Sequence, residues 1–362
     1  MGIDLKQLVI GNLSARIPIV QGGMGVGVSL SGLASATANA GGIGVIAAAG
    51  IGMFEPDGLT DFWGASVRAL KKTIREARAK TKGILGVNIM VALSNFADMV
   101  RTAIEEKIDI IFSGAGLPVN LPEYLNGSVT KLVPIVSSAR AATLLTKRWV
   151  DKYSYFPDAI VVEGPKAGGH LGFQSSQIND PKYELETLVT EIVHALKPFE
   201  DLAGRPIPVI AGGGIYTGAD IRRLIEHGAA GVQMATRFVA TDECDASAAF
   251  KTTYLNAKEE DLVVIQSPVG MPGRAINNTF LKDVAEGRHK PFSCPFHCIV
   301  TCDFKTAPYC ISLALFYAQK GQLGHGFAFA GCNAWRVDKI IPVQELMDTL
   351  VREYEESTPE CV

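Results

Sequence analysis

Eight short apolar runs recur between residues 17 and 238 of this 362-residue chain, and longer segments of helical periodicity separate them. Apolar and polar residues do not alternate within the runs, which is typical of parallel strands buried on both faces. In the helical segments, Ser29 or Ser31 could cap one helix that ends at Gly41, and Thr217 could cap another that ends at Gly228. The expected strands are residues 17–23, 42–48, 83–90, 108–114, 131–137, 158–164, 207–214 and 231–238.

Eight β-α units in about 250 residues are the repeat count of a TIM barrel. The rival is a doubly wound open sheet, which would be expected to stop near five or six parallel strands. We therefore predict an α/β fold with a TIM (β/α)8 barrel over residues 1–258. A smaller, mostly helical region over residues 259–362 follows, where "QSPVGMPGRAINN" breaks the alternation, and part of it is expected to return to the barrel.

The net charge of −3 contains no block of like charges, so neither nucleic acid nor an anionic membrane is expected as a partner. Small molecules are the expected partners. No apolar run reaches the ~18 to 20 residues of a membrane span, and the N-terminus lacks the pattern of a signal peptide. We therefore expect a cytoplasmic protein, and its oligomeric state stays open, with a homodimer as one option.

The ends of the last two expected strands favour a phosphate site. "AGGGI" places Gly212, Gly213 and Gly214 after the seventh strand, and "QMATRF" places Ala235 and Thr236 after the eighth. In a TIM barrel these two loops commonly bind phosphate through backbone N–H groups. No Walker motif or dinucleotide fingerprint is present, so a mononucleotide phosphate such as that of FMN is the better match.

Three other strand ends carry candidate groups. "QGGMG" after the first strand could let the backbone approach a ligand, or it could be a plain tight turn. Asn88 could be a satisfied core amide, or it could offer a donor and an acceptor to a heterocycle. His170 follows two glycines in "VVEGPKAGGHLGF", where a solvated loop histidine is the alternative to a functional side chain.

Taken in order, "QGGMG", "GVNIM", "VVEGPKAGGHLGF", "PVIAGGGI" and "GVQMATRF" resemble the nitronate monooxygenase (2-nitropropane dioxygenase) family. FMN-dependent enoyl-ACP reductase II and certain NADH:quinone reductases share that superfamily. The resemblance extends over about residues 15 to 340, including "SPVGMPGRAINN" and "GFAFAGCNAWRVDKI". It implies a TIM barrel that holds non-covalent FMN at its C-terminal face, with a small second domain covering the flavin.

The resemblance also implies a set of flavin contacts. Gly23 and Met24 would lie along the isoalloxazine, and Asn88 would reach its edge. Gly168 would let the backbone pass close to the flavin. The phosphate and ribityl chain would be held by Gly213, Gly214, Gln233, Met234, Ala235 and Thr236.

His170 matches the active-site histidine of the family, and an imidazole of pKa near ~6.5 could take a proton from an acidic carbon or hydrogen-bond a developing anion. Glu163 stands where many relatives have Gln. If it stayed ionised, a carboxylate at this position would disfavour the anionic reduced flavin.

Two reaction classes fit these motifs. In the first, FMN and O2 convert an alkyl nitronate or nitroalkane to a carbonyl compound and nitrite. In the second, NAD(P)H reduces FMN, which then reduces an enoyl thioester on acyl carrier protein, or a quinone. A basic patch at the flavin mouth would favour the acyl-carrier substrate, and its candidates could equally form an ordinary solvated face. They are Arg274, Lys282, Arg288 and Lys290. A flavin-storing barrel without turnover is the third reading, and it leaves His170 unexplained.

The run "SCPFHCIVTCDFKTAPYC" spaces Cys294, Cys298, Cys302 and Cys310 as C-x3-C-x3-C-x7-C. This is neither the C-x2-C pairing typical of zinc nor a ferredoxin run. Pro295 could begin a helix that aligns the first three thiols on one stripe. The four thiols could then bind an iron-sulfur cluster or zinc, or they could be buried small hydrophobes.

Overall fold

The computed structural model describes residues 5–288 and 294–358. Eight parallel strands form one sheet in the order β3-β11-β10-β8-β7-β6-β5-β4, and a parallel bridge between Val20 and Ile43 brings its two edges together. The predicted TIM-like barrel is confirmed, and each of the eight apolar runs contains one of its strands. The strands are β3 (Ile19–Gln21), β4 (Gly44–Ala47), β5 (Leu85–Asn88), β6 (Ile110–Ser113), β7 (Lys131–Val136), β8 (Ile160–Glu163), β10 (Val209–Gly212) and β11 (Gly231–Met234).

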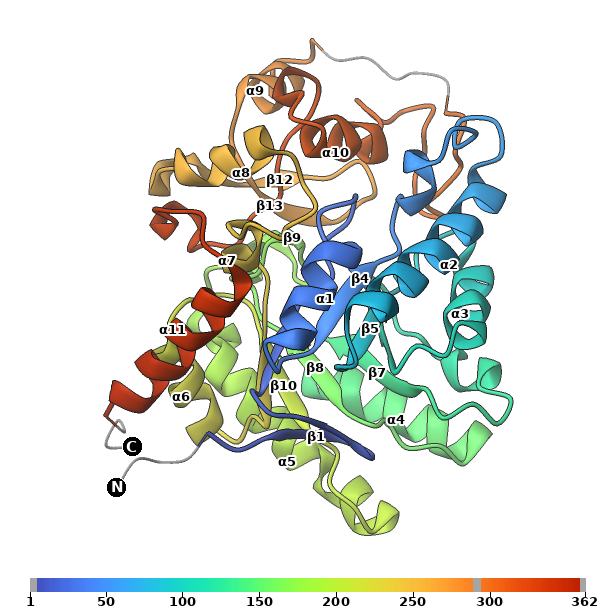
Figure 1. Cartoon of the computed structure of the whole chain (residues 1–362), viewed down its shortest axis with the longest axis vertical. Coiled ribbons are helices and arrows are strands. Elements are labelled where there is room, and N and C mark those ends of the chain that lie inside the picture. The colour runs from blue at the N-terminus through green and yellow to red at the C-terminus, as the bar shows by residue number, and fades with distance from the viewer. Residues whose placement is uncertain (1–4, 289–293, 359–362) are drawn as a thin grey trace.

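Helices cover the outside of the barrel and connect its strands (Figure 1). After β6 the connection contains only the 3-10 turn η2 (Leu121–Tyr124) where the repeat predicts an α-helix. The helices of the barrel region are α1 (Ser31–Asn39), α2 (Phe62–Lys80), α3 (Phe96–Glu105), α4 (Ala139–Tyr153), α5 (Leu185–Ala203), α6 (Gly218–Glu226), α7 (Thr236–Val239) and α8 (Ala248–Leu255).

The N-terminus of α1 is capped by a residue distant in sequence. The carboxylate of Asp245 accepts hydrogen bonds from the backbone N–H groups of Leu30, Gly32 and Leu33 at 2.7, 3.0 and 3.1 Å. The expectation that Ser29 or Ser31 provides this cap is therefore wrong, because a buried carboxylate binds three donors at once. The other helix signals are confirmed: Thr217 caps α6, and Gly41 and Gly228 follow the helix ends with positive φ.

The interior of the barrel is a dry core. Phe112, Val161 and Ile210 belong to one buried cluster with Leu8 and Ile10 of the N-terminal hairpin. That hairpin consists of β1 (Leu8–Ile10) and β2 (Leu13–Ala15), and it closes the end where the strands begin (Figure 1). The opposite, C-terminal end of the barrel is therefore the one left open for a ligand.

The C-terminal region covers that end. Its hairpin, β12 (Leu262–Gln266) and β13 (Pro272–Ile276), takes a third antiparallel strand from the barrel, β9 (Gly169–His170). The helices α9 (Thr279–Ala285) and α10 (Ile311–Gln319) lie above this sheet in Figure 1. The last helix, α11 (Val343–Glu356), lies beside α6 on the barrel wall (Figure 1). The division at residue 258 stays our proposal.

The helix expected after Pro295 is not formed. Residues 294–310 are irregular, and Cys310 is the N-cap of α10. Ile299 instead bridges Leu93 in antiparallel fashion, and the carbonyl of Cys298 accepts from the N–H of Ser94 at 3.0 Å. Backbone groups that pair with another segment cannot make i to i+4 bonds, which explains the error.

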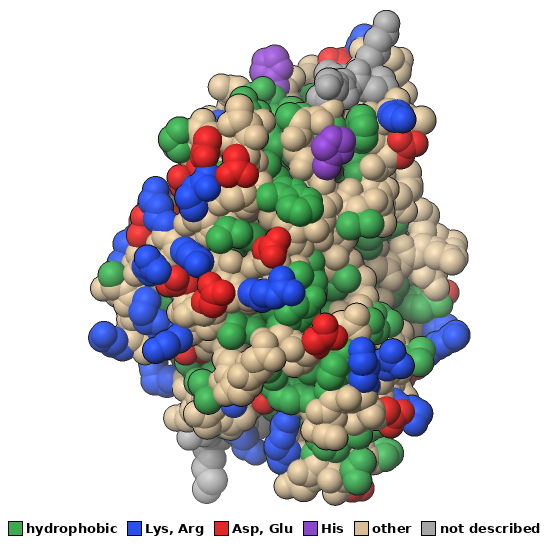
Figure 2. Space-filling view, turned by 90° about the vertical axis from the view of Figure 1, so that its right-hand side faces the viewer, with side chains coloured by type: hydrophobic (Ala, Val, Ile, Leu, Met, Phe, Trp, Pro, Cys, Tyr) green, Lys and Arg blue, Asp and Glu red, His purple; other side chains and the backbone are tan. Residues whose placement is uncertain are grey.

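The surface mixes charges of both signs. Figure 2 shows Lys and Arg interspersed with Asp and Glu on one face, with hydrophobic side chains scattered among them. Within residues 5–288 and 294–358, no helix is both long enough and apolar enough to cross a bilayer.

We predict that Gly218→Ala destabilises the contact between α6 and α11. A Cβ there would lie 2.1 Å from the backbone nitrogen of Tyr354 and 2.4 Å from the carbonyl oxygen of Leu350. Although Ala favours helices, this overlap should lower the free energy of unfolding by about 1–3 kcal/mol in denaturant titration. Gly324→Ala, whose Cβ meets nothing within 4 Å, is the control. Equal stability of the two variants would contradict the prediction.

Candidate active site

A cavity of about 500 Å³ opens at the C-terminal ends of the barrel strands. Asn88, Glu163 and Gln233 are the last or nearly last residues of β5, β8 and β11, and all three line it. Apolar side chains from the loops form much of the remaining wall. They include Val26, Met90, Leu93, Leu117, Met271, Leu315 and Phe329. The site therefore combines a polar floor with apolar sides.

The loop after β3 crosses this floor. A Cβ on Gly22 would lie 3.4 Å from the Cγ of Gln233, and a Cβ on Gly23 would lie 2.3 Å from the Cβ of Asn88. Only glycine at position 23 lets the backbone come this close to the side chain of Asn88. Gly23 and Met24 both line the cavity, so a flat ligand can lie against this backbone.

Glu163 and Gln233 stand on either side of Gly212, which pairs with both residues in the parallel register. Gly212 brings no side chain between them. The Glu163 carboxyl has no hydrogen-bond or ion-pair partner among the described residues, and burial raises its pKa to about 7. Near neutral pH this group therefore carries a proton in a large share of molecules, and a protonated carboxyl can donate a hydrogen bond as a Gln amide does.

His170 lies on β9, between the barrel and the covering sheet, and it lines the cavity. Its Nε2 and the Oγ of Ser267 are 2.8 Å apart, and its ring meets the edge of Phe329 with 5.0 Å between centroids. Nδ1 makes no hydrogen bond within the described part of the chain. These contacts exclude the reading of a solvated loop histidine.

Burial lowers the pKa of His170 to about 4. The imidazole is therefore neutral at pH 7, where it can donate or accept a hydrogen bond but is a weak base. The sequence interpretation, which used an unperturbed pKa, is corrected on this point.

Small residues form the other end of the cavity, where Ala235, Thr236, Gly168 and Gly331 line the wall. The N–H of Gly331 donates to the Oγ1 of Thr236 at 3.2 Å. Gly168 lies against the backbone of Ala330 and Gly331, where a Cβ would come within 2.5 Å of both. The C-terminal region thus completes this end of the site.

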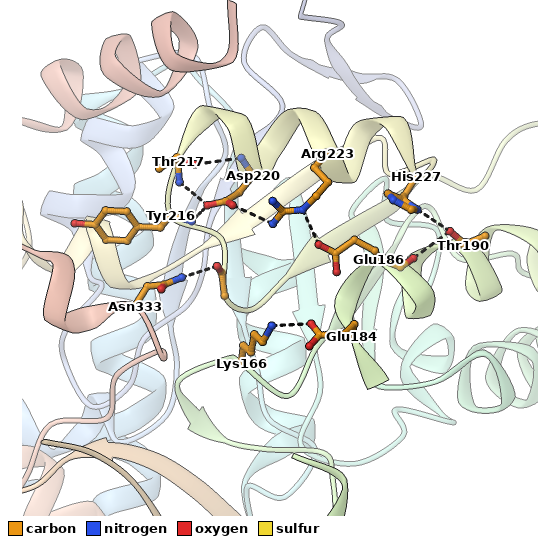
Figure 3. Close-up of polar contacts among 11 residues, drawn as sticks. Lys166, Glu184, Glu186, Thr190, Tyr216, Thr217, Asp220, Arg223, His227 and Asn333 are labelled. Atoms are coloured by element: carbon orange, nitrogen blue, oxygen red, sulfur yellow. Dashed lines mark hydrogen bonds and ion pairs between the residues drawn. The ribbon is translucent and has the colours of Figure 1, made fainter. Parts of the chain in front are cut away.

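Gly213, Gly214 and Met234 lie outside the cavity lining. Met234 is a core residue with 2% exposure. Gly213 and Gly214 have positive φ and lie against residues 164–167, and the Nδ2 of Asn333 donates to the carbonyl of Gly214 at 2.7 Å (Figure 3).

The N-terminus of α6, which follows this glycine loop, already has protein partners for most of its N–H groups. The Oγ1 of Thr217 accepts from the N–H of Asp220, and the Asp220 carboxylate accepts from the N–H groups of Tyr216 and Thr217 (Figure 3). Glu353 accepts from the N–H of Gly218 at 2.8 Å. An anion at this end of the barrel must therefore rely on the loops and not on the first turn of α6.

Arg274 does not belong to a basic patch. It is 7% exposed, and its Nη1 donates to the carbonyls of Pro165 and Ala167, at 2.7 Å each. Arg288 pairs with Asp283 and Glu286. Lys282 lies on α9 and Lys290 lies outside the described residues. Arg274 is therefore removed from the candidates for a basic patch. Its hydrogen bonds instead fix the segment that leads to His170.

Among the site residues that were not selected from the sequence, several belong to the C-terminal region. Ser267 and Met271 belong to "SPVGMPGRAINN", and Phe329 and Gly331 belong to "GFAFAGCNAWRVDKI". Both motifs are part of the resemblance to the nitronate monooxygenase family, so the sequence did contain a signal for these residues. A pattern in one segment does not show which residues face a cavity formed by a distant one.

The chain matches the family model described as nitronate monooxygenase over residues 6–353. It belongs to the nitronate monooxygenase family. A probable nitronate monooxygenase of Staphylococcus aureus strain JH9 is 28% identical over 300 residues, which cover 76% of the chain and 79% of that relative.

Two other relatives carry different names. The (3aS,4S,5R,7aS)-5-hydroxy-7a-methyl-1-oxo-octahydro-1H-indene-4-carboxyl-CoA dehydrogenase of Mycobacterium tuberculosis is 29% identical over 270 residues, covering 75% of the chain and 66% of the relative, just under two thirds. The structure of FabK from Thermotoga maritima superposes with a TM-score of 0.72 and 30% identity, over 94% of this chain and 93% of that one. Proteins similar to this chain thus carry the names of several different activities.

Titration of Glu163 should make stability depend on pH. Its folded pKa of about 7 lies above the ordinary 4.5, so the folded state binds its proton more tightly and the free energy of unfolding falls as pH rises between these values. Glu163→Gln removes this titration. From pH 4 to pH 8 the variant should gain up to about 3 kcal/mol relative to the parent chain, measured by denaturant titration.

The matched control is Glu191→Gln, at an exposed position on α5. It should leave the pH profile of the parent chain in place. An unchanged profile in Glu163→Gln would show that this carboxyl has the same pKa in the folded and unfolded chain, which would contradict the prediction.

Proposed function

We propose that the chain binds FMN in the main cavity and uses O2 to convert an alkyl nitronate to a carbonyl compound and nitrite. Family membership and the probable nitronate monooxygenase of S. aureus support this activity. The observation that carries it is the His170–Ser267 pair: the uncharged imidazole of His170 lines the cavity beside apolar walls, and Ser267 lies within hydrogen-bond distance of its Nε2.

The residues present fit FMN. The backbone of Gly23 and Met24 offers a flat surface for the isoalloxazine, and Asn88, Glu163 and Gln233 offer donors and acceptors to its polar edge. Ala235, Thr236, Gly168 and Gly331 would surround the phosphate and ribityl chain. The lining has Gly213, Gly214 and Met234 directly behind it. We therefore propose that these residues maintain the conformation of the loop around the phosphate. When bound, FMN supplies a ring that accepts electrons and reacts with O2.

The state of His170 favours a nitronate over its parent nitroalkane. A nitronate has already lost its acidic proton, so its oxidation needs no strong base, and a neutral imidazole suits that requirement. If Ser267 donates its hydroxyl proton to Nε2, the other ring nitrogen, Nδ1, carries the N–H and can donate it to a nitronate oxygen. Ser267 thereby selects the tautomer.

The apolar walls select the rest of the substrate. Met90, Leu93, Leu117 and Leu315 would contact an alkyl chain and exclude water from the reacting carbon. In a site with few charges, hydrogen bonds from His170 to an anion are strengthened by the low dielectric.

An FMN-dependent, NAD(P)H-linked reductase of the enoyl-ACP reductase II or quinone reductase type is the second candidate. The extensive match to FabK favours it. The same Nδ1–H could donate to the carbonyl oxygen of an enoyl thioester. The two candidates differ in electron donor, and that difference is measurable.

The purified chain should be yellow and contain FMN. Anaerobic mixing with propyl nitronate should bleach the flavin absorbance, and NADH or NADPH alone should leave it unchanged. Bleaching by a nicotinamide cofactor, with no response to the nitronate, would replace the first candidate with the reductase. A colourless protein that fails to bind added FMN would contradict both.

His170→Ala should keep FMN and lose turnover by about 10²-fold, because it removes the donor to the substrate anion. Steady-state kinetics with propyl nitronate measure the loss, and flavin absorbance measures cofactor content. His194→Ala, at an exposed position on α5, should leave both unchanged. Full activity in His170→Ala would remove the histidine from the mechanism.

A further inference from the structure

A second cavity of about 300 Å³ lies beside the main one, beneath the irregular segment before α10. Cys294, Cys298, Cys302 and Cys310 all line it, together with His297. All four cysteines are free thiols. Four soft donors on one cavity wall are more than packing requires, since any small apolar residue would fill the same space.

A buried tyrosine hydroxyl at the same cavity also lacks a hydrogen-bond partner among the described residues. Tyr309 lines the cavity, is 6% exposed, and its Oη makes no hydrogen bond within the described residues. Buried hydroxyls normally have partners, so this group offers an unused hydrogen-bonding position beside the four thiols. Two thiols already have weak hydrogen bonds: the N–H of His297 donates to the Sγ of Cys294 at 3.4 Å, and the Sγ of Cys298 is 3.2 Å from the Oγ of Ser312.

The electrostatics of the cluster disfavour free thiolates. Burial raises the pKa values of Cys298, Cys302 and Cys310, and the neighbouring Cys294 raises all three further. Cysteines in such surroundings are poor nucleophiles, which argues against a thiol catalyst.

The spacing of the thiols distinguishes between metals. Four sulfurs on a single zinc ion each lie ~2.3 Å from one point. Among the described side chains, no three of His, Cys, Asp or Glu are arranged to hold one metal ion. In an iron-sulfur cluster each iron takes its own thiolate, so the sulfurs stand around the cluster and farther apart. Four thiols that line one cavity without converging on a single metal ion suit the second arrangement, with one thiolate on each iron of a four-iron cluster.

We propose that Cys294, Cys298, Cys302 and Cys310 bind an iron-sulfur cluster in this cavity. The thiols release their protons to solvent as their sulfurs bind iron, and no electron transfer is part of the proposal. Cys298, Ile299, Ile311 and Ser312 line both cavities, so the cluster adjoins the main one. The proposal goes beyond the nitronate reaction and does not depend on it.

The test is metal analysis of the full chain, purified without oxygen and then incubated with sulfide and equal amounts of ferrous and ferric iron, which together give a four-iron core without a further oxidant. Iron and acid-labile sulfide should appear in equal amounts, and dithionite reduction should give an electron paramagnetic resonance signal of a reduced cluster. Absence of both elements after this incubation would overturn the proposal. Zinc without sulfide would overturn it as well, in favour of a mononuclear site.

Cys310→Ser is the decisive variant. Position 310 is the N-cap of α10, and serine is a favoured N-cap, so the helix should still form. The variant should lose at least half of the iron and sulfide while circular dichroism and FMN content stay unchanged. Cys332→Ser, at a cysteine outside the cavity, is the matched control and should keep the full metal content. An equal loss of iron and sulfide in both variants would contradict a site at these four thiols. Full iron and sulfide content in both variants would contradict it as well.

Discussion

The pairing of β9 with β13 is the contact on which the site depends. His170 faces Gly273 in this antiparallel register, and the N–H of Leu171 donates to the carbonyl of Pro272 at 2.8 Å. Arg274, on the same strand, holds the preceding turn through two carbonyls. The barrel alone therefore does not position its histidine, because the backbone bonds that orient it come from the C-terminal region.

Burial is the common cause of the unusual protonation states. It favours the neutral form of every titratable group, so it lowers the pKa of His170 and raises that of Glu163. A neutral imidazole and a carboxyl that is about half protonated near pH 7 reduce the fixed charge of the cavity. In the proposed reaction, an anionic substrate would then meet hydrogen-bond donors with less repulsion from Glu163, and Glu at a position where the family resemblance leads us to expect Gln would be compatible with a bound flavin.

The eight barrel strands could be predicted because each depends on a local apolar run. The polar strand ends were also visible, and Asn88, Glu163 and Gln233 lie together on the cavity floor. The predictions that were wrong concern segments whose hydrogen-bond partners lie far away in the sequence. Asp245 caps α1 from another part of the chain, and the segment around Cys298 pairs with Ser94 in preference to forming a helix. Neither spacing nor propensity within one segment contains that information.

The Asp245 carboxylate has a consequence for how the chain folds during synthesis. Its hydrogen bond to the N–H of Leu30 spans 215 residues. The first barrel helix thus has unsatisfied N–H groups until most of the chain has left the ribosome, and β3 must wait equally for β11. Such contacts raise the contact order, so barrel closure is expected to be late and cooperative, and a nascent half-barrel would expose unpaired strand edges to chaperones.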